Sequence, residues 1–115
     1  MTHEEIGDVI AKWFQTVKAA GLVLPDGWFG RPFDNLHRLT YLEARPHKLI
    51  LELDSQLLLV FTDLQTAQID DSELILSEFT HCTFDWHEFG CLVPHVVVYR
   101  SGIVKLVPPV GLTIP

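Results

Sequence analysis

The chain has 115 residues, of which 48% are hydrophobic and 20% are charged. This composition excludes an intrinsically disordered protein, and the length is sufficient for one domain, residues 1–115, with its own hydrophobic core. The 15 acidic residues outnumber the 8 basic ones and give a formal net charge of -7. This charge argues against nucleic acid and anionic membrane surfaces as partners, because both attract clustered lysine and arginine.

The first residues, MTHEEIGDVI, are acidic where a secretory signal is basic, and no apolar segment follows them. No stretch of the chain approaches the roughly 18 consecutive apolar residues of a membrane span. We therefore expect a cytoplasmic protein without a membrane partner. In that compartment Cys82 and Cys91 are expected to be reduced thiols rather than a disulfide.

Residues 3–20 are predicted to form an amphipathic helix. Apolar residues recur at helical spacing on one face, at Ile6, Ile10, Trp13, Phe14 and Val17. Thr2 and Glu5 fit a capping box at the start of the helix, and Gly21 is expected to cap its end in a left-handed conformation.

The segment 22–35 is predicted to be a connection, because Pro-Asp-Gly and Arg-Pro interrupt it. Within it and just beyond, aromatic, glycine and polar residues are unusually dense. Pro32 favours an extended conformation at Arg31, and tryptophan and arginine often carry binding energy at interfaces. The candidate binding residues are Trp28, Arg31, Asp34, Asn35 and His37.

A structural role for the same segment is the alternative hypothesis. Trp28 and Phe33 would then close one end of the core, and Arg31 would pair with Asp34 or Asp26. We expect Trp28 to be mainly structural, with the polar residues presented around it.

The rest of the chain is predicted to form antiparallel strands. They are expected at residues 36–44, 49–53, 57–61, 64–69, 74–79, 80–86, 95–99 and 103–107. Hairpin turns are predicted at Asp54-Ser55-Gln56 and at Arg100-Ser101-Gly102. The expected fold is α+β, with one amphipathic helix packed on a curved, mostly antiparallel sheet of about six to eight strands in a meander or roll.

Several predicted strands are apolar on both faces, notably 49–51, 57–61 and 96–99. One helix covers only two or three strands, because it is roughly 10 Å wide and strands lie about 4.8 Å apart. The second face must be covered by curling of the sheet, by the apolar C-terminal segment or by another copy of the chain. We favour a homodimer.

The stretch HCTFDWHEFGCLVPH, residues 81–95, is rich in side chains that bind metals. Its first residues alternate as in a half-buried strand, with Cys82 facing inward and His81 and Asp85 outward. Asp85, His87 and His95 are the set that a turn could bring together. We nevertheless expect no metal site and leave the convergence of these three open.

Signature motifs of hydrolases, P-loop proteins and zinc proteases are missing. We therefore expect no cofactor and favour a non-enzymatic module whose acidic surface binds a basic protein. In size and charge alone the chain resembles the small acidic bacterial proteins that include immunity proteins. The alternative is a small-molecule-binding protein or small enzyme with a pocket near His37, Tyr41 and Glu52.

Overall fold

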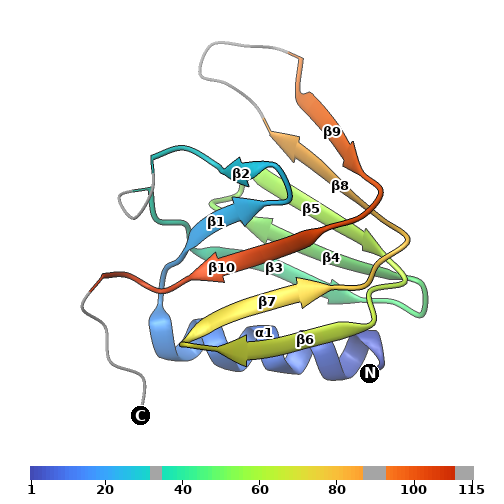
Figure 1. Ribbon diagram of the computed structural model, residues 1–115, viewed down its shortest axis with the longest axis horizontal. Coiled ribbons are helices and arrows are strands. Elements are labelled where there is room, and N and C mark those ends of the chain that lie inside the picture. The colour runs from blue at the N-terminus through green and yellow to red at the C-terminus, as the bar shows by residue number, and fades with distance from the viewer. Residues whose placement is uncertain (32–34, 87–92, 111–115) are drawn as a thin grey trace.

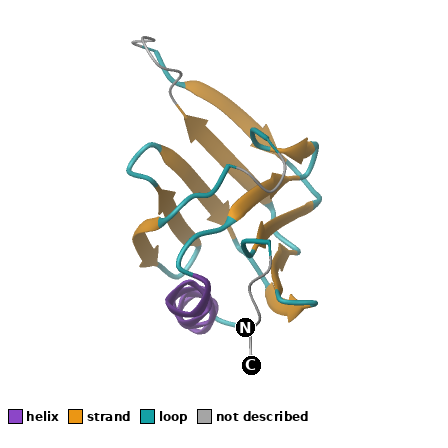
Figure 2. Cartoon of the chain, turned by 90° about the vertical axis from the view of Figure 1, so that its left-hand side faces the viewer, coloured by secondary structure: helices purple, strands orange, loops and turns teal. Residues whose placement is uncertain are grey.

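The computed structural model describes residues 1–31, 35–86 and 93–110, which form one helix and ten strands. The strands make two antiparallel sheets of five strands each, one in front of the other in Figure 1. Helix α1 (His3–Val17) lies along one side of this pair of sheets, at the lower left in Figure 2. The predicted α+β fold, with one N-terminal helix packed on antiparallel sheet, is confirmed.

Each sheet is named by its place in Figure 1. The front sheet has the order β2 (Gly27–Trp28), β1 (Gly21–Leu24), β10 (Ile103–Val107), β7 (Glu73–Ser77) and β6 (Thr66–Asp70). The rear sheet has the order β3 (Leu39–Ala44), β4 (Lys48–Leu53), β5 (Leu57–Thr62), β8 (His81–Trp86) and β9 (His95–Tyr99). Because α1 contacts β3, β4 and β6, it covers the side where β3 and β6 are the edge strands.

The predicted strand count of six to eight is wrong, since the described residues contain ten strands. The two additional strands, β1 and β2, lie in the segment that was predicted to be a connection. Pro25 and Asp26 form the turn of a short hairpin, in which Leu24 pairs with Gly27 and Val23 with Trp28. Leu22 and Leu24 on β1 are buried in the core. Their packing stabilises a strand in a segment that was predicted to be a loop because of its turn residues.

The start of α1 follows the prediction, and its end does not. Thr2 and Glu5 form the capping box, with the Glu5 amide donating to Thr2 Oγ1 at 3.1 Å. The helix ends at Val17, and Lys18, with a φ of 70°, is the cap in place of Gly21. Gly21 instead begins β1, where an added Cβ would lie 3.0 Å from the Trp28 ring.

The segment Arg100-Ser101-Gly102 is not a hairpin turn, contrary to the prediction. It joins β9 in the rear sheet to β10 in the front sheet. The Tyr99 hydroxyl donates to the Asp26 carboxylate at 3.0 Å, and a Cβ on Gly102 would lie 2.7 Å from Pro25. This close approach favours glycine at the crossing, because its φ of +117° is also rare for other residues.

The core lies between the two sheets and α1. Alternate residues point into it, for example Leu49, Leu51 and Leu53 on β4. The front sheet supplies Leu22, Leu74, Leu76, Val104 and Leu106. Each sheet therefore covers the inner face of the other, which explains how one helix suffices for so many apolar strands.

Candidate protein-binding face

The outer surface of the rear sheet carries two rows of side chains that cross its five strands. The first row consists, in register, of Tyr41, Glu52, Leu58, Asp85 and Val96. The second row consists of Glu43, Ile50, Val60, Thr83 and Val98. We call the residues of these two rows the acidic face. They point away from the core because the residues between them on each central strand are the buried ones.

Two carboxylates of the acidic face have no cationic partner in the part of the chain that the structure describes. Glu52 and Asp85 flank Leu58 in the first row, about 10 Å apart across two strand spacings. Among the described residues neither forms an ion pair, and Glu52 accepts a hydrogen bond from the Thr40 hydroxyl at 3.0 Å. The first row therefore presents two negative charges around a half-buried leucine.

The third carboxylate of the acidic face is already paired. Glu43 lies 2.8 Å from the Arg45 guanidinium. A hydrogen bond from the Tyr41 hydroxyl to Glu43, followed by desolvation, raises the pKa of Tyr41 above its ordinary value of 10.0. Glu43 is thus held by two neighbours, and Glu52 and Asp85 carry the uncompensated charge.

A polar row borders the acidic face. Lys48 Nζ donates to the Thr62 hydroxyl at 2.7 Å, and that hydroxyl lies 3.1 Å from His81 Nε2. A hydroxyl beside an imidazole is the beginning of a nucleophile–base pair. No described carboxylate contacts the His81 ring to orient it, and the three side chains stand on an open sheet surface. These two contacts link β4, β5 and β8 along the border of the acidic face.

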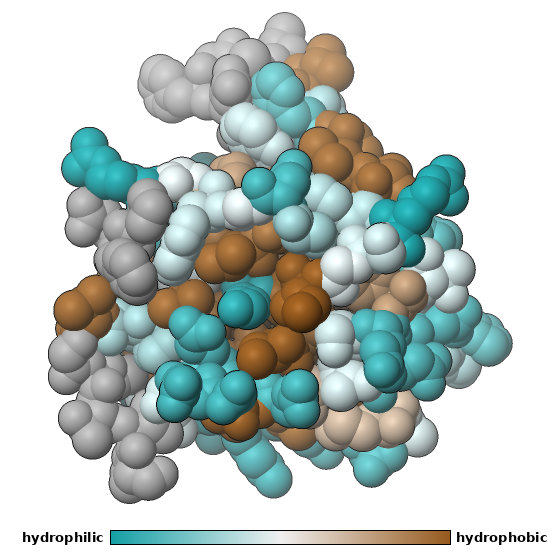
Figure 3. Space-filling model, in the orientation of Figure 1, coloured by the Kyte–Doolittle hydropathy of each residue, from teal (hydrophilic) through white to brown (hydrophobic). Residues whose placement is uncertain are grey.

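Strand β9 is exposed on both of its faces. Val96 and Val98 on the acidic face are 55% and 50% exposed, and Val97 on the opposite face is 38% exposed. In Figure 3 apolar residues are visible over β9, at the upper right. The neighbouring Trp86 ring stacks on His95 with a centroid distance of 4.5 Å and packs edge-on against Phe29.

The outer surface of the front sheet is different. Its central row contains Trp28, Val23, Lys105, Ile75 and Gln68. Apolar and polar residues are interspersed on this side (Figure 3), and Lys105 lies 3.9 Å from Glu73. Glu73 thus has a cationic neighbour on this surface, whereas the exposed Asp70 at the end of β6 forms no ion pair among the described residues.

The predicted binding residues of the segment 26–37 do not form one exposed group. Arg31 is exposed, Asn35 is half-buried and His37 is buried, while Asp34 and Phe33 lie outside the described residues. Trp28 is half-buried on the outer side of the front sheet. Within the described part of the segment, the aromatic residue that closes the core is Phe29, whose ring lies 5.2 Å from that of Phe84.

His37 holds the chain to the β4–β5 turn. Its Nδ1 donates to Asp54 Oδ2 at 2.7 Å, and the Arg38 amide donates to Asp54 Oδ1 at 2.9 Å. The Nε2 atom of His37 is buried and has no hydrogen-bond partner among the described residues. Because that atom is inaccessible, His37 cannot act as a base on a bound molecule in this conformation.

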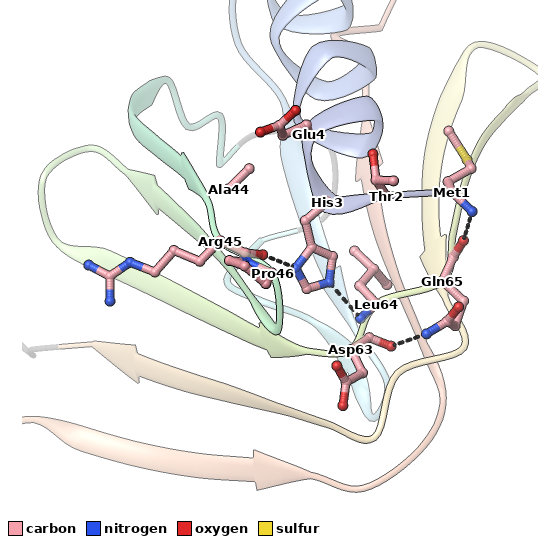
Figure 4. Close-up of a pocket in the computed structure, with 10 residues that line it drawn as sticks. All are labelled: Met1, Thr2, His3, Glu4, Ala44, Arg45, Pro46, Asp63, Leu64 and Gln65. Atoms are coloured by element: carbon pink, nitrogen blue, oxygen red, sulfur yellow. Dashed lines mark hydrogen bonds between the residues drawn. The ribbon is translucent and has the colours of Figure 1, made fainter.

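The residues of the alternative pocket hypothesis are also separated. Tyr41 and Glu52 are paired across strands on the outer surface, whereas His37 points into the interior. A cavity of about 360 Å³ lies elsewhere, between the start of α1 and the β3–β4 and β5–β6 connections (Figure 4). At its wall His3 Nδ1 donates to the Arg45 carbonyl at 2.7 Å, and His3 Nε2 accepts from the Leu64 amide at 3.0 Å. Both ring nitrogens are used, so His3 is a structural clamp.

The described residues contain no group of three side chains placed to hold a metal ion. His87 and Cys91 lie outside them, so the convergence of Asp85, His87 and His95 stays a hypothesis. Cys82 faces the core as predicted, and burial raises the pKa of its thiol to about 12. A thiol of this kind is unreactive at neutral pH.

Sequence reasoning did not propose the acidic face as a candidate site, although it identified parts of it. It placed Asp85 outward and found residues 96–99 apolar on both faces. The signal that it lacked was strand register, which brings Glu52 and Asp85 to either side of Leu58.

Comparisons of the chain with protein-family models, with curated proteins and with solved structures found no match. Within the part of the chain that the structure describes, no helix has the length and apolar character needed to cross a membrane.

Proposed function

We propose that this protein is a non-enzymatic, self-associating binding module whose acidic face binds a basic protein partner. The observation that carries the proposal is the position of Glu52 and Asp85 on either side of Leu58, where neither carboxylate has an ion-pair partner within the described ranges. A partner suited to this surface presents lysine or arginine on either side of an apolar side chain. The partner is a protein rather than a nucleic acid, since the net charge of -7 repels phosphate.

The physical basis is electrostatic complementarity combined with apolar burial. A partner cation placed near Glu52 or Asp85 gains an ion pair that no described side chain now supplies. The apolar members of the two rows provide area that leaves water on binding. The charge also steers a basic partner toward the protein and raises its association rate.

The test uses a synthetic peptide of alternating lysine and valine as the probe. We expect its titration to shift the NMR signals of backbone amides on β4, β5 and β8, and the affinity to fall steeply as salt rises. Increasing the ionic strength from about 0.1 M to about 1 M shortens the Debye length from about 10 Å to about 3 Å. A peptide of alternating glutamate and valine should not bind.

Two double variants with the same change of charge locate the binding surface. Glu52→Gln/Asp85→Asn should weaken binding of the lysine–valine peptide at least tenfold. Asp70→Asn/Asp71→Asn, at the exposed β6–β7 turn, should leave it nearly unchanged. Equal losses in both variants would mean that only the net charge matters and would contradict a defined site.

We place the protein in the cytoplasm, where the buried Cys82 thiol would stay reduced. No contact among the described residues favours the alternative pocket, because Tyr41 and Glu52 lie on the outside and His37 lies inside.

A further inference from the structure

The edge strands of the two sheets differ in how well they are protected. Strands β3 and β6 lie beside α1, and β2 has only two residues. Strand β9 has five residues, none of them Lys, Arg, Asp, Glu or Pro, and among the described residues it is an edge strand of the rear sheet. Soluble proteins usually block such an edge with a charge, a proline or a covering element.

The unprotected edge is also apolar. Its centre is Val96-Val97-Val98, with exposures of 55%, 38% and 50%. A strand with an open edge and exposed valines on both faces is a template for pairing with another strand.

We propose that β9 pairs with β9 of a second copy, antiparallel and about a two-fold axis at Val97, so that the two rear sheets become continuous. In this register Val96 lies opposite Val98 of the partner subunit, and the two strands overlap over their full length. The contact is isologous, as is usual in homodimers. This inference rests on the self-association in the proposed function and identifies the contact between the two copies. We call this contact the β9 seam.

Charge decides between this seam and the alternative, a dimer packed through the two acidic faces. Face-to-face packing would bury Glu52 and Asp85 against their own copies, which like charges disfavour. At the β9 seam the valines carry no charge. Asp85 and Asp85 of the partner subunit would be separated by three strand spacings, about 14 Å. This separation exceeds the Debye length of about 8 Å at physiological ionic strength.

The seam leaves the acidic face open in each subunit. Pairing of one five-residue strand is a small contact compared with the roughly 1,200–2,000 Å² of stable interfaces. We therefore expect a reversible dimer whose population rises with protein concentration.

The experiment is sedimentation velocity over a concentration series up to about 100 µM, a range suited to weak interfaces. The wild-type protein should approach twice its monomer mass of 13.1 kDa. Val96→Lys/Val98→Lys should be monomeric throughout, because each lysine would lie opposite a lysine of the partner subunit. Val96→Lys/Val98→Glu should remain dimeric, because in the antiparallel register each lysine would lie opposite a glutamate.

The two double variants carry the same number of charged side chains at the same exposed positions, so each is the control for the other. Their thermal melting should confirm that both fold. A monomeric wild type would overturn the proposal, as would a dimeric lysine–lysine variant or a monomeric lysine–glutamate variant.

The result is separable from the partner-binding test. If the protein does not dimerise through β9 but the acidic face binds a basic partner, the lysine–valine peptide still binds, and its binding still depends on Glu52 and Asp85. If β9 forms the dimer but the acidic face binds no basic partner, the lysine–lysine variant is monomeric and the lysine–glutamate variant dimeric, while the lysine–valine peptide fails to bind.

Discussion

Removal of the Asp54 carboxylate should destabilise the protein, because this carboxylate joins residues 37–38 to the β4–β5 turn. Asp54 stands at the β4–β5 turn with a φ of 55° and a side chain that is 36% exposed. It accepts hydrogen bonds from His37 Nδ1 and from the Arg38 amide. Asp54→Ala leaves the buried His37 ring with neither nitrogen paired among the described residues.

The expected loss in free energy of unfolding is about 3–4 kcal/mol. Hydrogen bonds to charged groups contribute about 1.5–3 kcal/mol each, and the lower value applies to both here because the carboxylate is partly exposed. Alanine in the left-handed conformation adds about 1 kcal/mol. Asp54→Asn keeps one acceptor and tolerates that conformation, so it should cost only about 1.5 kcal/mol.

Urea unfolding at pH 7 measures these differences. His37→Phe, made alone and with Asp54→Ala, completes a double-mutant cycle, and the coupling energy should be about 1.5 kcal/mol. A loss below about 1 kcal/mol for Asp54→Ala, or additive effects in the cycle, would refute the view that this pair fastens residues 37–38 to the turn.

Two further predictions concern the surroundings of the rear sheet. Burial, and then the hydrogen bond to Asp26, raise the pKa of Tyr99 from 10.0 to about 12, so its neutral form favours the folded state. Stability is therefore expected to be lost between pH about 10 and about 12, and less steeply in Tyr99→Phe, as a urea series would show. Phe29→Ala should cost about 2–3 kcal/mol, because this half-buried ring packs on the core. Arg31→Ala should lower the free energy of unfolding by only about 0–1 kcal/mol, because Arg31 is exposed. Equal losses in the two variants would contradict the view that Phe29 packs on the core while Arg31 lies on the surface.

Local signals in the sequence were sufficient for several of the separate elements. The capping box at Thr2 and Glu5, the apolar stripe of α1 and the alternation in residues 80–86 depend on neighbours a few residues apart. The turn at Asp54-Ser55 was predicted for the same reason, and both residues have the positive φ of such turns. The hairpin of β1 and β2 was missed, because its two strands are too short to show a period of two.

The candidate site was predicted less well. The polar residues of segment 26–37 were grouped because they are close in sequence, yet the fold turns His37 inward and leaves Arg31 outside. The proposed function depends on two carboxylates, Glu52 and Asp85, that are far apart in the sequence. The fold places them on the two strands that flank β5, on either side of Leu58. No local pattern encodes such a register.

The sequence by itself determined the α+β class, the start of α1, the inward side of β8 and the excess of negative charge. Only the tertiary structure decided that the described strands divide into two sheets, that residues 100–102 cross between them and that β9 lies at an edge of the rear sheet. The contacts behind these choices join distant residues, such as Tyr99 with Asp26, 73 positions apart, and His3 with Leu64, 61 positions apart. Each of these long-range contacts depends on the packing of the whole core. A strand can in principle pair with several others, and burial of the apolar faces selects one arrangement.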